Sequence, residues 1–477
     1  MKKTGLFKII MFTLIGMIIA SWIISASYFE SGVLSDLGMN YTGLFNSFEM
    51  FFKSFLIDYF VQVLLLLLAV GGLYGVLAKS GVYKKLVNKI VDDLKGREFL
   101  FMVLASLFIA ILTSVFDYGF ALIIFFPLLI SVLLAMGYDR VTIGVATFGA
   151  MLVGIIGNTV GYNTAGIIAK VLSTKTSDYF FYKLALLLIS YVALLLYLSK
   201  AKRHKLTEKG FKDVDFFLEN DVETDKSVKA AVIVLCVIFV LLVLGCTNWE
   251  EIFNVSFFTN IHDKIVNWEP KLPYLHLTSE GFKVGTEKIA IFGALLGDVG
   301  ALGNWYHSEM TVICFLSTLL LGLIYKVNPF DGMNEGMQKV IKPVVMLFLV
   351  YCVLYVAANL MIYPTIAELI LNLTSKFRVI LGAITMAIGT FFHVDALFVA
   401  NYAAPQIALK AGNASFVALL LQAIYGVVEF VSPTSIYLAF GLTYLGVSYK
   451  EWVKKTWKLL LVLLAITLVV LLIAYYA

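Results

Sequence analysis

The sequence predicts an all-α membrane protein that crosses the bilayer many times, and three observations support this prediction. Hydrophobic residues make up 61% of the 477-residue chain, and charged residues make up only 14%. The mean hydropathy of +0.93 is far from the balance of a soluble domain. Apolar runs long enough to span a bilayer also recur along the chain. The clearest of these runs cover residues 57–78, 180–199, 229–246 and 457–476.

The N-terminus has two possible interpretations. Lys2 and Lys3 precede an apolar stretch over residues 9–24, and Ser-Ala-Ser follows at 25–27. This pattern is compatible with a signal peptide. We favour an uncleaved first helix, because a multispan chain has no soluble domain to export.

Lysine and arginine are concentrated in alternate loops, which predicts the orientation of the chain. The basic segments are 79–98, 200–212 and 449–458. We expect them on the cytoplasmic side of the cytoplasmic (inner) membrane, together with the N-terminus. The segments 28–53 and 173–178 are poorer in basic residues and are expected outside.

Charge also divides the chain into two transmembrane halves. Residues 1–199 form the N-terminal half, and residues 200–228 form a linker that runs from basic to acidic and is expected in the cytoplasm. Residues 229–477 form the C-terminal half, with a polar insert at 248–288 that is expected outside. The net charge of +5 comes from short loops and indicates no nucleic-acid partner. The four cysteines lie singly in apolar runs, so we expect neither a structural metal site nor a disulfide framework.

Two stretches repeat one spacing of acidic, proline, glycine and threonine residues. The first is Asp117, Pro127, Gly137 and Thr159, at intervals of 10, 10 and 22 residues; the second is Asp395, Pro405, Gly412 and Thr434, at intervals of 10, 7 and 22 residues. Acids and prolines are disfavoured in apolar segments, so the match suggests a duplicated half-unit. Counting the spans between loops places the start of the first copy on the cytoplasmic side and the start of the second copy on the outer side. This predicts an inverted repeat. Lys376 and Arg378 run against the positive-inside rule at the second start.

Each copy begins with an apolar segment that a short polar tip interrupts, over about 99–136 and about 379–410. The tips are Phe116 to Gly119 and His393 to Asp395. Each segment is either two full spans joined by a loop or a re-entrant hairpin with its tip at mid-depth. A hairpin is tolerated only where its tip is buried or lines a water-filled cavity. The duplication favours hairpins.

Each copy continues with an apolar helix, over about 141–172 and about 415–440, whose composition predicts a break. Glycine and asparagine accept non-helical angles, and proline removes a backbone donor. The freed carbonyls and helix ends would form a site for a cation or a carboxylate, whereas a glycine-rich packing face is the alternative. The expected site residues are Gly157, Asn158, Thr159, Asn163 and Thr164 in the first copy, and Ser432, Thr434 and Ser435 in the second. Asn158, Thr159 and Thr434 are candidate Na+ ligands.

Three acids are expected within the bilayer, namely Asp117, Asp395 and Glu429. A charge at the centre of a membrane costs about 2.5–3.5 kcal/mol on insertion scales, so such residues tend to be paired, hydrated or functional. They could bind a coupling cation, relay protons or meet an ammonium group. His393 could share a proton with Asp395, although a single histidine in an apolar stretch is more often only hydrogen-bonded.

Four stretches of the chain resemble the C4-dicarboxylate anaerobic carrier family (DcuC and YfcC type) of the ion-transporter superfamily. They are Gly71 to Gly75 with Ser80-Gly81, Gly157 to Asn163, Trp305 and Glu309 through Gly322, and Ser432 to Ser435 followed by Tyr449 to Trp452. The resemblance covers most of the chain. It implies an inverted-repeat carrier of small organic anions or amino acids with two re-entrant hairpins and two unwound helices, commonly a homodimer.

Carried over by position, the resemblance places Asp117 and Asp395 at the hairpin tips. It places Asn158-Thr159 and Pro433-Thr434 in the unwound segments. The chain departs from the family pattern at the tips, where Phe-Asp-Tyr-Gly and His-Val-Asp replace the expected glycine- and serine-rich sequences. Fixed negative charge at both tips disfavours a dicarboxylate unless cations or protons neutralise it.

These observations predict a secondary active transporter and not an enzyme. It would move a C4-dicarboxylate or an amino acid by alternating access, coupled to Na+ or H+ or by exchange. A basic amino acid antiporter is an alternative, because the acidic tips favour a substrate with an amine. An ion channel and an intramembrane enzyme using His393 and Asp395 are alternatives of other classes, and no nucleophile or metal set accompanies that pair. The expected partners are a small-molecule substrate, the lipid bilayer and a second copy of the chain, with no cofactor.

Overall fold

The fold is built almost entirely from helices, as the sequence predicts. A computed structural model describes residues 5–30, 32–53, 58–203, 217–218, 224–278, 281–288, 290–297 and 299–477. Within these residues, seven helices are long and apolar enough to cross a membrane. They are α3 (Asp58–Lys79), α5 (Glu98–Val115), α10 (Phe180–Leu198), α12 (Lys229–Cys246), α16 (His307–Tyr325), α17 (Pro329–Leu360) and α23 (Tyr449–Tyr476). Most of the predicted linker at 200–228 lies outside the described residues.

The first part of the chain forms α1 (Leu6–Ala20), the two-stranded antiparallel pair β1 (Ala26–Glu30) and β2 (Val33–Gly38), and α2 (Leu44–Lys53). Helix α1 packs against α17, and its Ile10 is fully buried. The expected first helix is therefore present. A short amphipathic helix, α4 (Val82–Asp93), follows α3 and packs on it.

Glycines allow α3 and α17 to pack closely in the centre of the molecule. A Cβ added to Gly336 of α17 would lie 2.0 Å from the carbonyl oxygen of Gly71 in α3. A Cβ added to Gly75 would lie 2.2 Å from the carbonyl oxygen of Gly332. Small residues let helix backbones approach in this way. The glycine stretch of α3 therefore has a packing role.

In the N-terminal half, the segment predicted as a hairpin is two helices with a short tip between them. Helix α5 ends at Val115, and the chain returns through the 3-10 helix η2 (Gly119–Phe125) into α6 (Phe126–Ala135). The following helix runs through α7 (Arg140–Gly144), the π-helix η3 (Val145–Gly149) and α8 (Ala150–Ile156). It then breaks at residues 157–161 and resumes as the π-helix η4 (Tyr162–Gly166) and α9 (Ile167–Val171).

The C-terminal half repeats this order. After α18 (Tyr363–Leu371), helices α19 (Val379–Phe392) and α20 (Ala396–Ala411) form the second hairpin. Helix α21 (Ala414–Glu429) then breaks at residues 430–435 and resumes as α22 (Ile436–Leu445). Both predicted breaks are present. Helix α21 packs against α8, and α23 packs against α10, so the two halves share one core.

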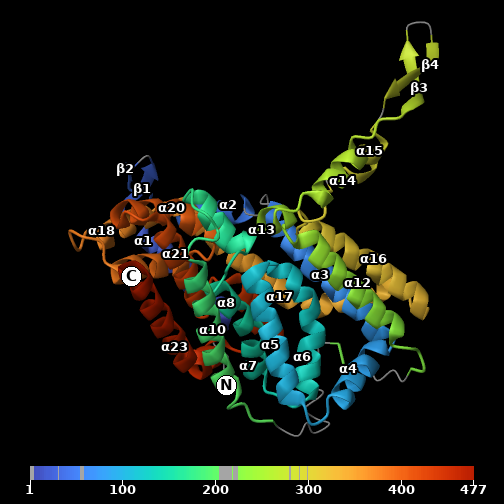
Figure 1. Ribbon diagram of the computed structural model, residues 1–477, viewed down its shortest axis with the longest axis horizontal. Helices are drawn as coiled ribbons and strands as arrows, with labels where there is room; N and C mark the ends of the chain where they lie inside the picture. The colour runs from blue at the N-terminus through green and yellow to red at the C-terminus, as the bar shows by residue number, and fades with distance from the viewer. Residues whose placement is uncertain are drawn as a thin grey trace.

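The polar insert at 248–288 forms an arm that stands away from the helical body (Figure 1). It contains α13 (Trp249–Phe253), α14 (Phe257–Val266) and the antiparallel strands β3 (Lys271–Thr278) and β4 (Gly281–Lys288). Helix α15 (Ile291–Leu296) returns beside α14.

Candidate functional site

The tip of the first hairpin holds a buried aspartate in a strained conformation. Asp117 has φ 54°, in the left-handed region that non-glycine residues rarely adopt, and only 1% of it is exposed. Its Oδ2 accepts a hydrogen bond from Asn158 Nδ2 at 2.9 Å, and its carbonyl oxygen accepts one from Asn163 Nδ2 at 2.6 Å. Thr164 also lies close to the carboxylate. Four of the predicted site residues therefore converge on this tip.

The break in the first broken helix is bonded to the last turn of α5. Ser114 Oγ donates to the Gly157 carbonyl at 2.6 Å, and the Thr159 backbone N–H donates to the Ser114 carbonyl at 2.8 Å. Thr159 Oγ1 lies 3.1 Å from the same carbonyl. These contacts replace helix hydrogen bonds that the break removes, so the unwound backbone remains satisfied although it is buried.

Gly161 has no room for a side chain. A Cβ added there would lie 2.6 Å from Asp117 Cβ and 2.7 Å from the Asn158 side-chain amide. Its backbone N–H donates to Asn158 Oδ1 at 2.8 Å. The Asn158 amide therefore makes two bonds: its oxygen accepts from the backbone of the break, and its nitrogen donates to the carboxylate of the tip.

The tip of the second hairpin is built differently. Asp395 caps the start of α20 and accepts a hydrogen bond from the Phe398 backbone N–H at 2.8 Å. Its backbone is extended and its side chain is only partly buried. His393 is buried, and its ring stacks on Phe398 with 3.6 Å between centroids. Both aspartates lie at tips as predicted, but only Asp117 is enclosed by the neighbouring break.

The second break repeats the contact between threonine and the hairpin. Thr434 Oγ1 donates to the Phe391 carbonyl at 3.1 Å, and Ser432 Oγ donates to the same carbonyl at 2.7 Å. Phe391 lies in the last turn of the first helix of its hairpin, as Ser114 does in the other half. Thr159 and Thr434, which share an offset in the sequence, therefore make corresponding contacts.

A third acid lies buried beside the second break. Glu429 ends α21, and its Oε2 accepts a hydrogen bond from Ser435 Oγ at 3.0 Å. The charges of Asp117 and Asp395 both act on Glu429, so the three predicted acids belong to one cluster that draws on both halves. Among the described residues, no three acidic, histidine or cysteine side chains converge closely enough to hold a metal ion.

Gln422 joins the two halves at the site. From α21 its Nε2 donates to the Asn158 carbonyl at 2.7 Å. One turn later in the same helix, Gly426 lies close to α8. A Cβ added to Gly426 would lie 2.6 Å from the Ile156 backbone nitrogen. The second half therefore satisfies a carbonyl that the break in the first half leaves free.

Two aromatic residues of α23 satisfy the free carbonyls of the second break. Trp452 Nε1 donates to the Phe430 carbonyl at 2.9 Å, and the Tyr449 hydroxyl donates to the Val431 carbonyl. Trp452 is 1% exposed. Its ring packs against Gly144 of α7, where an added Cβ would lie 3.1 Å from the ring. The Tyr-Lys-Glu-Trp motif thus supports the backbone of the break.

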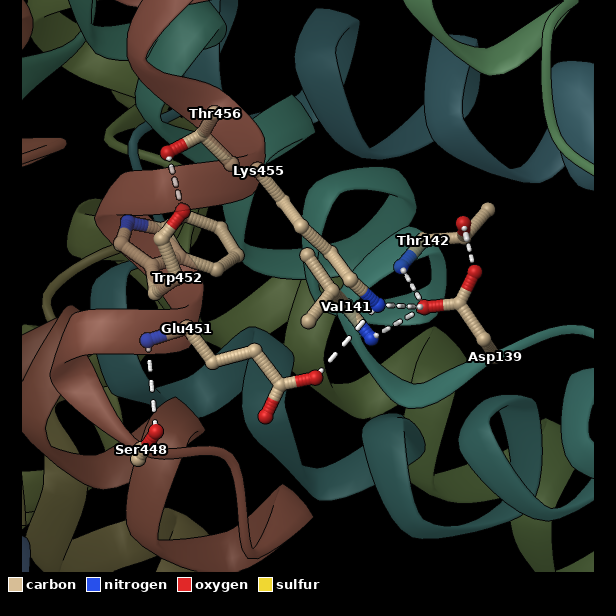
Figure 2. Close-up of polar contacts among 8 residues, drawn as sticks. All are labelled: Asp139, Val141, Thr142, Ser448, Glu451, Trp452, Lys455 and Thr456. Carbon is tan, nitrogen blue, oxygen red and sulfur yellow. Dashed lines mark hydrogen bonds and ion pairs between the residues drawn. The ribbon is translucent and has the colours of Figure 1, made fainter. Parts of the chain in front are cut away.

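Polar contacts also join the start of α7 to α23 (Figure 2). Asp139 caps α7 by accepting from the backbone N–H groups of Val141 and Thr142 at 3.0 and 3.2 Å. Lys455 Nζ lies 3.3 Å from Asp139 Oδ1 and 3.4 Å from Glu451 Oε1. Burial alone would raise the pKa of Asp139, but the bonds from Thr142 and the charge of Lys455 outweigh it and hold this pKa below its usual value.

Sequence reasoning missed Ser114, Gln422 and Tyr425, the last of which lies one turn before Glu429 on α21 and close to its carboxyl group. Gln422 lies seven residues before Glu429, which places both on one face of α21. A polar residue at that spacing in an apolar helix could have indicated that Gln422 lies near the site. Ser114 gave a weaker signal, because a serine beside a tip is common in any turn.

Comparisons with known proteins complete the description. Residues 4–476 match the profile of the DcuC family, described as C4-dicarboxylate anaerobic carrier. A search of curated proteins finds no match to the chain. Among solved structures, the YdaH transporter of Alcanivorax borkumensis, whose crystal structure is described as revealing an unusual topology, is 12% identical with a TM-score of 0.42, and the alignment covers 98% of each chain.

Proposed function

Because the chain belongs to the C4-dicarboxylate anaerobic carrier family, we propose that it is a secondary active transporter of a small organic carboxylate. The observation that carries this proposal is the pairing of each hairpin tip with a broken helix. Thr159 bonds to the end of α5, and Thr434 bonds to the end of α19. Broken helices near the midplane, with hydroxyl and amide side chains beside the break, are the usual binding elements of such carriers.

Alternating access follows from the order of elements. Each half contains a hairpin and then a broken helix, and the two halves meet where α8 crosses α21. With the basic loops in the cytoplasm, the first hairpin enters from inside and the second from outside, so the halves form an inverted repeat in the cytoplasmic membrane. The N-terminus is then cytoplasmic, and the arm that carries β3 and β4 is external. We propose the homodimer as the assembled form.

The acid cluster supports the proposal that transport is coupled to a cation. Asp117 and Glu429 are buried, and a buried charge is costly unless it is paired. The side chains that bond to them are the neutral Asn158 and Ser435, and the neutral Thr164 and Tyr425 lie close by. Na+ or H+ therefore neutralises the cluster when a dicarboxylate binds. Asn158, Thr159 and Thr434 supply oxygen ligands of the kind that Na+ prefers.

A second candidate substrate is an amine-bearing amino acid. Three acids in one cluster provide the countercharge that an ammonium group needs. The carboxylate of the same amino acid would bind to the hydroxyls and amides at the breaks. Exchange of one amino acid for another would then be the transport mode.

Counterflow in proteoliposomes tests these proposals. The purified protein is loaded with succinate, aspartate, arginine or lysine, with and without Na+ or a pH gradient. We expect saturable counterflow of at least one carboxylate. Non-saturable flux without counterflow would contradict the carrier and support a channel.

The site is tested by Asp117→Asn, Glu429→Gln and Asp395→Asn, with Asp93→Asn on the exposed surface of α4 as the control. Asparagine also caps helices, so Asp395→Asn should fold. We expect the first two variants to lose coupled uptake while Asp93→Asn retains it. Undiminished coupled uptake by both Asp117→Asn and Glu429→Gln would contradict the assignment.

A further inference from the structure

A small cavity lined by aromatic side chains adjoins the tip of the first hairpin. It encloses about 30 Å³, which is room for about two water-sized groups. Five aromatic residues line it, with Asn163, Asn248 and His307 among the polar ones; the aromatic set is Phe116, Tyr118, Tyr162, Trp305 and Tyr306. Tyr306 is 48% exposed, so the cavity lies near the surface of the protein.

Two of the aromatic residues, Tyr118 and Trp305, bond through their polar groups to other parts of the protein. The Tyr118 hydroxyl lies 2.7 Å from Thr247 Oγ1, and Trp305 Nε1 donates to the Gly300 carbonyl at 2.9 Å. The rings of Phe116 and Tyr118 stack with 5° between their planes. These contacts hold the rings of Phe116, Tyr118 and Trp305 in place, and these rings offer π surface to a ligand.

The charge around the cavity is negative. Among the described residues, those that line it include neither lysine nor arginine. Asp117 lies between Phe116 and Tyr118 in the chain, and Glu309 Oε2 accepts from the Tyr306 backbone N–H at 2.9 Å. Aromatic faces and nearby carboxylates both attract a cation, and aromatic rings select organic ammonium groups in particular.

The cavity shares Asn163 with the candidate site. Asn163 lines the cavity and also donates through Nδ2 to the Asp117 carbonyl at 2.6 Å. Its amide leaves Oδ1 as an acceptor for an N–H donor. A group bound in the cavity would therefore lie next to the tip that carries Asp117.

We propose that this cavity is a subsite for the ammonium group of an amine-bearing substrate. It rests on the proposed carrier function and specifies the substrate class of the same site. A substrate that carries both an amine and carboxylates would place its ammonium group among the rings and its carboxylates at the broken helices. A strongly hydrated inorganic cation gains less from aromatic faces than an organic ammonium does.

Aspartate and succinate provide a matched test, because they differ by one amine on the same C4-dicarboxylate. In Tyr162→Leu and Tyr306→Leu we expect the KM for aspartate to rise roughly three- to thirty-fold, while the KM for succinate changes less than twofold. Tyr162→Phe and Tyr306→Phe keep the ring and should stay close to the parent protein. Tyr41→Leu, an exposed tyrosine away from the cavity, is the control. An equal rise for both substrates, or no rise in either leucine variant, would overturn the subsite.

Competition by methylammonium chloride gives a second measurement that needs no variant. It should inhibit aspartate uptake by the parent protein and leave succinate uptake unchanged, relative to equal NaCl. The proposal would be overturned if methylammonium inhibited the uptake of aspartate and succinate equally, or if it did not inhibit aspartate uptake. It would also be overturned if NaCl inhibited aspartate uptake to the same extent. Transport of succinate without aspartate would overturn the subsite and leave the carrier intact. Failure to transport any carboxylate would contradict the carrier itself.

Discussion

Individual residues at the two tips have different roles, although the sequence spaces them alike. Asp117 lies two residues after the end of α5 in a left-handed conformation and bonds to Asn158, whereas Asp395 precedes α20 as its cap. The matching offsets suggested a duplicated half-unit, and in the structure Thr159 and Thr434 make corresponding contacts. The sequence could not distinguish the two aspartates, because helix-capping and site geometry both place an acid beside a turn.

Gly161→Ala is expected to impair transport by displacing Asp117 or Asn158. The added Cβ would lie 2.6 Å from Asp117 Cβ, and overpacking of this kind costs about 1–3 kcal/mol. Gly16→Ala in α1 is the control, because nothing lies within 4 Å of its Cβ. Initial uptake rates and the midpoint of thermal unfolding in detergent measure both variants. Normal uptake and stability in Gly161→Ala would show that the tip is loosely packed.

At the scale of elements, residue types predicted both breaks but not what supports them. Glycine and asparagine at 157–161 and proline at 433 marked where the helices stop. Trp452 and Tyr449, which satisfy carbonyls of the second break, come from α23. A partner from a distant helix is set by tertiary packing, so its sequence position gave no indication of this role.

Asp139→Ala is expected to destabilise the start of α7 by about 1 kcal/mol, because two backbone N–H groups lose their cap. Asp139→Asn keeps a capping side chain and should lose only the ion pair with Lys455. That pair is 36% and 45% exposed, and such pairs contribute about 0–1 kcal/mol. Thermal unfolding in detergent separates the two effects. Equal destabilisation by both variants would mean that charge, not capping, dominates.

The same carboxylate predicts a pH dependence. The pKa of Asp139 is lowered in the folded protein, so its stabilising contribution is present above the unfolded value of about 3.9 and is lost as the pH falls through the lower folded value. The stability difference between the parent and Asp139→Asn should therefore shrink as the pH falls from 5 to 3. A difference that stays constant over this range would contradict the assignment.

At the scale of the whole molecule, the composition predicted a helical membrane protein, and the described helices agree with this. The loop charges predicted two halves, and this division stays a prediction. What they could not predict is how the halves meet. The packing of α8 on α21 depends on Gly426 and on one polar side chain, Gln422, that crosses from one half to the other. Apolar helices can pack in many registers, so the sequence pattern alone does not select this one.

Gln422→Met tests whether this contact couples the halves. Methionine has a similar size, so the main change is the loss of the donor to the buried Asn158 carbonyl at 2.7 Å. An unsatisfied buried acceptor costs about 1–3 kcal/mol, and its carbonyl belongs to the break that holds Asp117. We therefore expect lower thermal stability together with weaker coupled uptake, whereas Gln338→Met on the exposed face of α17 should change neither.

If the Gln422 variant lost stability but kept the same KM and cation dependence, the contact would join the halves without shaping the site. A double variant with Thr159→Val separates these outcomes further, because two side chains that hold one break should show non-additive effects on uptake.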